Sequence, residues 1–333
     1  MYKLVRSQII SHPKGGIIQT PLLLPSFSSR GVYKFFNNDR GKSSLRSFYK
    51  LMNRNLRCEH LVSAYDIHKH YIDIDDVPLS DYVVIDSGGF ECLDFISRSK
   101  YWEKCFSATD YQLIMDSLPK QISANLVTFD KQYLGVPVSK QLSYAIPFAD
   151  NVHEQNQLVT LLLKPSTSSI VSIGEIEKNV KELKCFDVIG VTERELGFTI
   201  EEKVTNLMKL RIILDENLIN TPIHVFGCLE PMWIVLFYLA GAEIFDGLTW
   251  MSSCFRNEGV VRLQDTMLLD GLLNKSVSDE YMSLIDRNME SLDMLKSSLI
   301  EFFHTSDYTL FDGYNINYLD IINTMQKKVN YGW

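Results

Sequence analysis

The sequence lacks any long hydrophobic run. Among its 333 residues, no uninterrupted apolar stretch approaches the roughly 20 residues that a membrane-spanning helix needs. Residues 1–6 (MYKLVR) also lack the apolar core of a signal peptide. We therefore expect a cytoplasmic protein with no membrane partner.

Cysteine is scarce and shows no paired spacing. A disulfide framework requires many cysteines in a short secreted chain, and a cytoplasmic protein keeps its thiols reduced. The scatter favours reduced thiols. The six positions are Cys58, Cys92, Cys105, Cys185, Cys228 and Cys254.

Positive charge is also in short supply. Lys and Arg number 33 against 41 Asp and Glu, which gives a formal net charge of −8. Because phosphate binding needs clustered Lys and Arg, this balance argues against a broad, non-specific grip on nucleic acid. Residues 28–57 are the exception, with eight basic side chains and a single acid, Asp39. They form either a local phosphate contact or a solvated loop. The candidate contacts are Arg30, Lys34, Arg40 and Lys42.

Short apolar runs rich in Val, Ile and Leu recur along the chain. Amphipathic segments at 173–183 and 200–214, and a short apolar segment at 231–240, have helical spacing. Buried strands that alternate with helices are typical of parallel βα units. The eight runs are residues 21–27, 60–66, 82–86, 125–130, 158–164, 186–191, 223–227 and 242–247.

Eight such units predict a (β/α)8 barrel, an α/β fold, rather than a doubly wound open sheet. Five acids fall at or just past the ends of different runs, and a barrel gathers strand ends on one face, where active sites lie. We expect a single domain, with the barrel over about 15–262 and a C-terminal helical tail over about 263–333 that supplies the eighth barrel helix. The five acids are Asp66, Asp86, Asp130, Glu193 and Asp246.

One strand end has a distinctive sequence. The run 82–85 is followed by a carboxylate, two glycines that permit a sharp turn and close approach of a ligand, and an aromatic ring. The alternative is an ordinary turn in which Asp86 caps the next helix and Phe90 packs in the core. The sequence of the turn is Asp86-Ser87-Gly88-Gly89-Phe90-Glu91.

The strand-end sequences together resemble the tRNA-guanine transglycosylase superfamily over residues 15–260. The turn after residue 85 resembles the superfamily's most specific motif, and the other pieces follow in the same order along the chain. These pieces are Gly16-Ile17-Ile18-Gln19-Thr20-Pro21, Thr128-Phe129-Asp130, Ile189-Gly190-Val191 with Glu193 and Glu195, His224-Val225-Phe226-Gly227 and Ile244-Phe245-Asp246.

The chain departs from this pattern in ways that favour one branch. The superfamily's zinc site needs three closely spaced cysteines and a histidine, whereas only Cys254 and His304 follow Asp246 here. We therefore expect no zinc and no other cofactor. Glu91 replaces a usual Gln, and 247–250 (GLTW) departs from the usual sequence after the eighth strand. In these differences the chain resembles the DpdA-type transglycosylases, which place 7-deazaguanine bases in DNA.

The resemblance implies base exchange at C1′ of a nucleotide through a covalent glycosyl–enzyme intermediate. Asp246 matches the nucleophile and Asp86 the general acid and base, with helix capping as the alternative for each. Phe90 would stack on the base, Asp130 would accept hydrogen bonds from its edge, and Glu193 or Glu195 would orient a loop. Further pocket groups are Ser87, Gly88, Gly89, Val191, Thr192 and Gly227.

The implied partners are DNA and a preQ0-like 7-deazaguanine base, with an accessory protein or a second copy of the chain as a further partner. Two other functions stay open: a transglycosylase acting on tRNA, and a non-catalytic nucleic-acid-binding subunit of a transglycosylase heteromer. Asp66, His68 and His70, near three further acids, read as a polar loop rather than a metal site.

Overall fold

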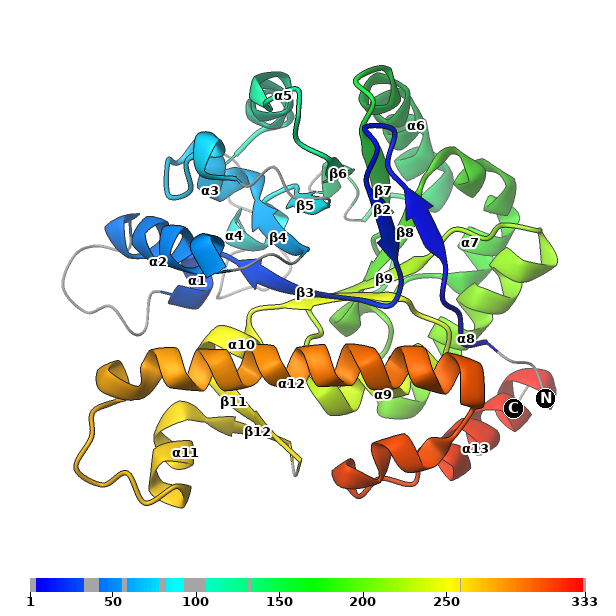
Figure 1. Cartoon of the computed structure of the whole chain (residues 1–333). Coiled ribbons are helices and arrows are strands. Elements are labelled where there is room, and N and C mark those ends of the chain that lie inside the picture. The colour runs from blue at the N-terminus through cyan, green and yellow to red at the C-terminus, as the bar shows by residue number, and fades with distance from the viewer. Residues whose placement is uncertain are drawn as a thin grey trace.

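Eight parallel strands close into a barrel in the computed structural model (Figure 1). Each strand pairs with the next one along the chain, and the last pairs with the first. The structure describes residues 4–32, 42–55, 59–77, 82–92, 106–130, 133, 135–257 and 259–331. The barrel strands are β3 (Leu22–Phe27), β4 (His60–Ser63), β5 (Val83–Asp86), β6 (Ala124–Val127), β7 (Leu158–Leu162), β8 (Val188–Thr192), β9 (Ile223–Phe226) and β10 (Ile244–Gly247).

Helices surround the barrel, and two small hairpins are added to it. The α-helices are α1 (Ser29–Val32), α2 (Lys42–Asn55), α3 (Ala64–His68), α4 (Gly89–Cys92), α5 (Ala108–Ser117), α6 (Val138–Glu154), α7 (Ile173–Lys178), α8 (Ile200–Glu216), α9 (Pro231–Leu239), α10 (Thr249–Ser252), α11 (Leu263–Leu269), α12 (Val277–Thr305) and α13 (Tyr318–Tyr331). The 3₁₀ turns are η1 (Ile74–Asp76), η3 (Val180–Cys185), η4 (Glu193–Glu195) and η5 (Tyr308–Tyr314), and the hairpin strands are β1 (Ile9–Ser11), β2 (Ile17–Gln19), β11 (Ser253–Arg256) and β12 (Gly259–Arg262).

The predicted barrel is confirmed, and each of the eight apolar runs overlaps a barrel strand, with β6 starting one residue before its run and β8 ending one residue after its run. The helix expected from 200 runs to Glu216, and Thr199 and Glu202 form a capping box at its start. The helix expected over 173–183 is shorter. It ends at Lys178, where Asn179 leaves helical geometry, and the chain continues as η3.

The hairpin of β1 and β2 closes the N-terminal end of the barrel. Its inward-facing Ile10 and Ile18 belong to a buried cluster with the first residues of several strands, among them Leu22, Leu158 and Ile244. Alternate residues of a strand face opposite sides, so Ile9 and Ile17 point outward and are exposed. The barrel interior is therefore sealed on this side by side chains that the eight-strand pattern did not include.

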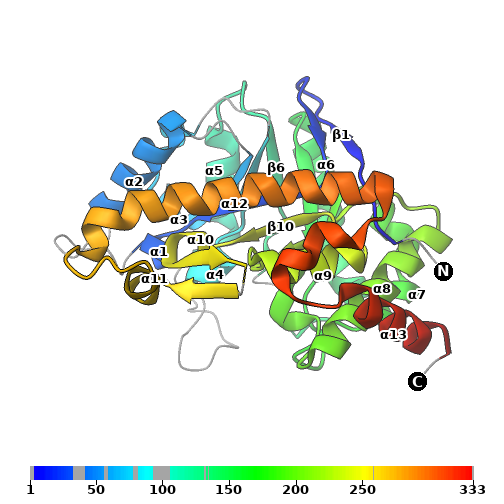
Figure 2. The same cartoon turned by 60° about the horizontal axis from the view of Figure 1, so that its bottom comes forward.

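The C-terminal tail packs against the barrel. The long helix α12 crosses the molecule beside β3, α9 and α10, so it takes the place of the eighth barrel helix (Figure 2). The helical pattern predicted from residue 263 is interrupted between α11 and α12, where Gly271 has φ +70°. Helix α13 packs against α8 and α9. No helix in the described part of the chain is long and apolar enough to span a membrane.

Candidate functional site

Two carboxyl groups end strands that lie on different sides of the barrel. Asp86 is the last residue of β5, and Asp246 stands one residue before the end of β10. Because the strands are parallel, both lie at the C-terminal end of the barrel, which we call the mouth. The negative charge of Asp246 is among the causes that raise the pKa of Asp86. The structure thus brings together two residues that are 160 positions apart in the sequence.

Asp246 is held by three hydrogen-bond donors. Its Oδ2 accepts from Ser26 Oγ at 2.7 Å. Its Oδ1 lies 3.0 Å from His224 Nε2 and accepts from the backbone N–H of Gly227 at 3.2 Å. Gly227 has φ +75°, a conformation that favours glycine and turns its N–H toward the carboxylate. The side chain is buried, with 9% of its surface exposed, so these donors largely take the place of water around the carboxyl group.

The surroundings of Asp86 are different. Its Oδ2 accepts a hydrogen bond from the N–H of Gly88 at 3.1 Å, a local turn contact that keeps part of the predicted capping role. Its carboxyl is partly exposed but closely surrounded by protein, and this desolvation is the main reason why its pKa lies well above the usual range. The charges of Glu91 and Asp130 raise the pKa further. Asp86 is therefore suited to hold a proton.

The turn after β5 is shaped by its glycines. Gly88 has φ +80°, and a Cβ at this position would lie 2.7 Å from Cβ of Tyr65. A Cβ on Gly89 would lie 2.6 Å from Oδ1 of Asp130. The same oxygen accepts from Ser87 Oγ at 2.7 Å. The two glycines thus allow the turn to lie directly against the carboxylate of the next strand end.

Asp130 belongs to a buried ion group that the sequence did not reveal. The ammonium of Lys164, just past the end of β7, lies 3.2 Å from Asp130 Oδ2 and 3.3 Å from each carboxylate oxygen of Glu195. Lys164 is buried, with 6% of its surface exposed. The one available signal is a lysine directly after a run in which Thr160 is the single polar residue.

The structure separates the two glutamates that the sequence left open. Glu195 pairs with Lys164 and so connects with Asp130, whereas Glu193 pairs with Lys203 of α8. Glu195 is therefore the acid that belongs to the mouth network. Val191 is buried in β8, and Thr192 lies partly exposed at its end.

Two more acids are buried in the short helices that follow β4 and β5. Glu91 accepts hydrogen bonds from Ser28 Oγ at 2.6 Å and Ser63 Oγ at 2.9 Å. Asp66 accepts from the N–H of Ser29 at 2.9 Å, and burial, followed by the charge of Glu91, raises its pKa. No group of three or more His, Cys, Asp or Glu suited to a metal ion occurs among the residues that the structure describes. The expectation of no zinc stays a prediction.

Phe90 lies at the rim of the mouth. Its surface is 40% exposed, so simple core packing does not describe it. The guanidinium of Arg30 lies 5.1 Å from the ring centroid, which is within the range of a cation–π contact, and it donates to the backbone oxygen of Glu91. Of the other basic candidates, Lys42 begins α2, while Lys34 and Arg40 lie outside the described residues.

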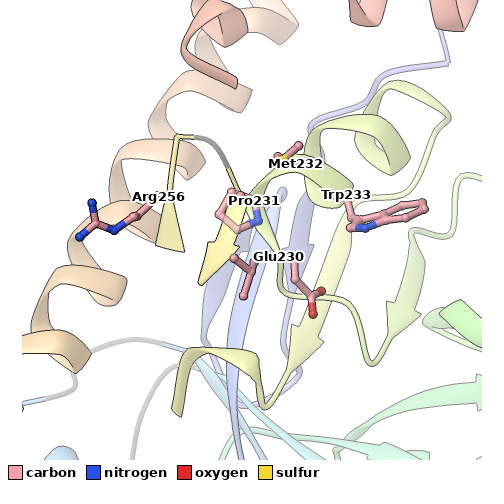
Figure 3. Close-up of a pocket in the computed structure, with 7 residues that line it drawn as sticks. Glu230, Pro231, Met232, Trp233 and Arg256 are labelled. Carbon is pink, nitrogen blue, oxygen red and sulfur yellow. The ribbon is translucent and has the colours of Figure 1, made fainter. Parts of the chain in front are cut away.

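A pocket of about 210 Å³ lies where the start of α9 meets the hairpin of β11 and β12 (Figure 3). Glu230, three residues after Gly227, is part of its wall, and Arg256 lies on the hairpin side. Glu230 accepts a hydrogen bond from Thr249 Oγ1 at 2.6 Å, which links the loops after β9 and β10. The residues that line the pocket are Glu230, Pro231, Met232, Trp233, Arg256, Gly259 and Val260.

Comparison of the chain with models of protein families and with curated proteins finds no match. The case for a function therefore rests on the geometry of the mouth and on the resemblance of its strand-end sequences.

Proposed function

We propose that the protein is a base-exchange transglycosylase that replaces guanine in DNA with a 7-deazaguanine base. One observation carries the proposal: two carboxyl groups at the barrel mouth have environments that suit opposite roles. The oxygens of Asp246 are held by three hydrogen-bond donors and keep a site for a reacting carbon, and burial raises the pKa of Asp86, which favours its protonated form. Covalent base exchange needs one carboxylate nucleophile and one acid.

In the first half-reaction, an oxygen of Asp246 attacks C1′ of the target nucleotide. The bond between C1′ and N9 of guanine breaks, and its electron pair goes to the base. Asp86 gives its proton to the departing guanine, so the base leaves neutral. Asp246 is then a glycosyl ester and Asp86 is a carboxylate.

In the second half-reaction, N9 of the incoming 7-deazaguanine attacks C1′ and loses its proton to Asp86. The ester bond breaks, and its electron pair returns to Asp246. Both carboxyl groups are restored to their starting states, so no other reactant is needed.

The base would lie between the turn after β5 and the ends of β6 to β9. The exposed ring of Phe90 offers a stacking surface once Arg30 moves aside, and the carboxyl oxygens of Asp130 would accept hydrogen bonds from the N–H groups on the guanine edge. Because the target base must leave the helix stack to reach buried acids, the enzyme would flip it or act on an unpaired strand.

The choice of DNA over tRNA rests on the resemblance to the DNA-modifying branch and on the absence of the zinc ligand pattern from the sequence. The mouth itself suits either nucleic acid, and it argues only against the binding subunit. In a subunit without catalysis, nothing would require two carboxyl groups with different surroundings to be kept within each other's electrostatic reach.

The proposal is tested by incubating the protein with a radiolabelled 7-deazaguanine precursor and either duplex DNA, single-stranded DNA or tRNA. We expect label in DNA and none with Asp246→Asn. Glu243→Gln, at the opposite end of the barrel, serves as the matched acid-to-amide control and should retain label. Label in tRNA alone would replace the DNA proposal with the tRNA one. No label in any of the three, with candidate partner proteins added, would favour the binding subunit.

A further inference from the structure

The two oxygens of Asp246 are not equivalent. Oδ1 faces two nitrogen donors, His224 Nε2 at 3.0 Å and the N–H of Gly227 at 3.2 Å, and Oδ2 faces one hydroxyl, Ser26 Oγ at 2.7 Å. A carboxylate oxygen has two lone-pair sites. Both sites of Oδ1 are therefore used, while Oδ2 keeps one for a reacting carbon.

His224 contacts one of these oxygens, Oδ1, from a buried position. His224 is the second residue of β9 and is fully buried. Its ring stacks on the ring of Phe226, with 3.7 Å between the centroids. Its other ring nitrogen, Nδ1, is buried and has no hydrogen-bond partner among the described residues. When Asp246 is ionised, Nε2 must carry the hydrogen, because the carboxylate only accepts.

We infer that Asp246 attacks through Oδ2, and that His224 is a positioning residue which holds Oδ1 through Nε2–H. This inference rests on the proposed function. In the glycosyl ester, Oδ2 is bonded to C1′ and Oδ1 is the carbonyl oxygen. When the incoming base attacks C1′, the electron pair of the Oδ2–C1′ bond returns to the carboxylate, and negative charge develops on both oxygens.

The hydrogen bonds to Oδ1 strengthen during that second half-reaction. A donor that is already in place stabilises the developing charge, as donors of an oxyanion hole do. In the first half-reaction the carboxylate loses charge, so the same donor gives no comparable advantage. His224 thus acts mainly on release of the glycosyl group to the incoming base.

The kinetic test uses His224→Leu and His224→Gln in the full chain. We expect His224→Leu to slow transfer from the ester to 7-deazaguanine by about 10²-fold, in the range for one lost oxyanion donor, so that the covalent adduct accumulates. His224→Gln, whose amide N–H replaces the donor, should recover to within about tenfold of the wild-type rate, with KM for the base within about threefold in both variants. His60→Leu removes a buried histidine whose ring contacts Tyr49, and it should not accumulate adduct.

Two outcomes would overturn the inference: a folded His224→Leu without accumulated adduct, or a His224→Gln as impaired as His224→Leu. Thermal unfolding of each variant shows whether it is folded. The ring tautomer is read separately, without substrate, from ¹⁵N NMR of histidine-labelled protein. Hydrogen on Nε2 of His224 supports the contact with Asp246, and hydrogen on Nδ1 alone refutes it. If the wild-type protein transfers no base, the proposed function fails, while the tautomer still decides whether His224 donates to Asp246.

Discussion

The two ends of the barrel both contain buried acids, but the groups that surround these acids differ. At the N-terminal end, Glu243 accepts from Gln8 at 2.7 Å and Thr20 at 3.0 Å, with the guanidinium of Arg211 3.8 Å away. Arg211 also binds Asp215 at 2.8 Å and two backbone carbonyls. The hairpin of β1 and β2 then covers this end. Glu243 is thus held by two neutral donors and faces an opposite charge.

At the mouth, acids face other acids. Asp86 lies in the field of Glu91, Asp130 and Asp246. The cation of Lys164 pairs with Asp130 and Glu195. Crowding of like charges raises the free energy of the ionised state and makes a proton available. The comparison teaches that the number of buried acids does not distinguish the two ends of this barrel. What distinguishes the mouth is one acid, Asp86, whose pKa is raised by the charges of other acids in the described part of the chain.

The largest effect should follow from removing the proton donor. In Asp86→Asn, the exchange rate should fall by about 10²- to 10⁴-fold, the usual contribution of a general acid or base. In the wild-type protein, the rate should decline as the pH rises through the elevated pKa of Asp86, because the acid is then ionised. Rates of label incorporation between pH 6 and pH 9 measure this. A variant as fast as the wild type would remove Asp86 from its role.

The lysine of the mouth gives the next largest effect. Lys164→Met leaves Asp130 and Glu195 without their shared cation, and loss of one partner of a buried pair costs about 3–5 kcal/mol. Urea unfolding should show this loss. Lys203→Met removes a more exposed ammonium, with 15% of its side-chain surface exposed against 7% for Lys164, and should cost less, about 1 kcal/mol. Equal losses in the two variants would mean that the group around Lys164 is no tighter than the more exposed pair.

The smallest effect is expected at the opposite end. Burial raises the pKa of Glu243 to about 7 despite Arg211 nearby, against 4.5 for an ordinary glutamate. The raised pKa favours folding at low pH, where Glu243 is protonated in both states. This stabilisation is lost as the pH rises from 4.5 through about 7, by about 3 kcal/mol at most.

As the pH rises from 5 to 8, the free energy of unfolding should therefore fall less in Glu243→Gln than in the wild-type protein. Its exchange rate at a given pH should stay within about threefold of the wild-type rate. The free energy of unfolding at the two pH values measures the first expectation. An unchanged pH dependence would show that Arg211 keeps Glu243 ionised throughout.

The strands, the barrel and the placement of Asp86 and Asp246 at one face followed from local patterns in the sequence. Apolar runs report strands, and parallel strands align their ends, so no long-range information was needed. The partners that tune those acids were not predicted. Ser26 and Lys164 are ordinary residues at strand ends, and His224 entered only as part of a motif. Their contacts cross between neighbouring strands, and the facing residues depend on register and on side-chain direction.

The hairpins escaped prediction for a related reason. Three-residue strands such as β1 carry too few alternating positions to stand out from a loop. Their stability comes from what they cover: Ile10 and Ile18 become strand residues because the barrel offers them a buried cluster.

The most direct test of the central claim is to trap the covalent intermediate. The protein is mixed with guanine-containing DNA, without the incoming base, then denatured, and its mass and peptides are determined. We predict a DNA adduct on the peptide that contains Asp246, and none in Asp246→Asn of unchanged fold. An adduct on another residue, or one that survives in Asp246→Asn, would contradict the claim that Asp246 is the nucleophile.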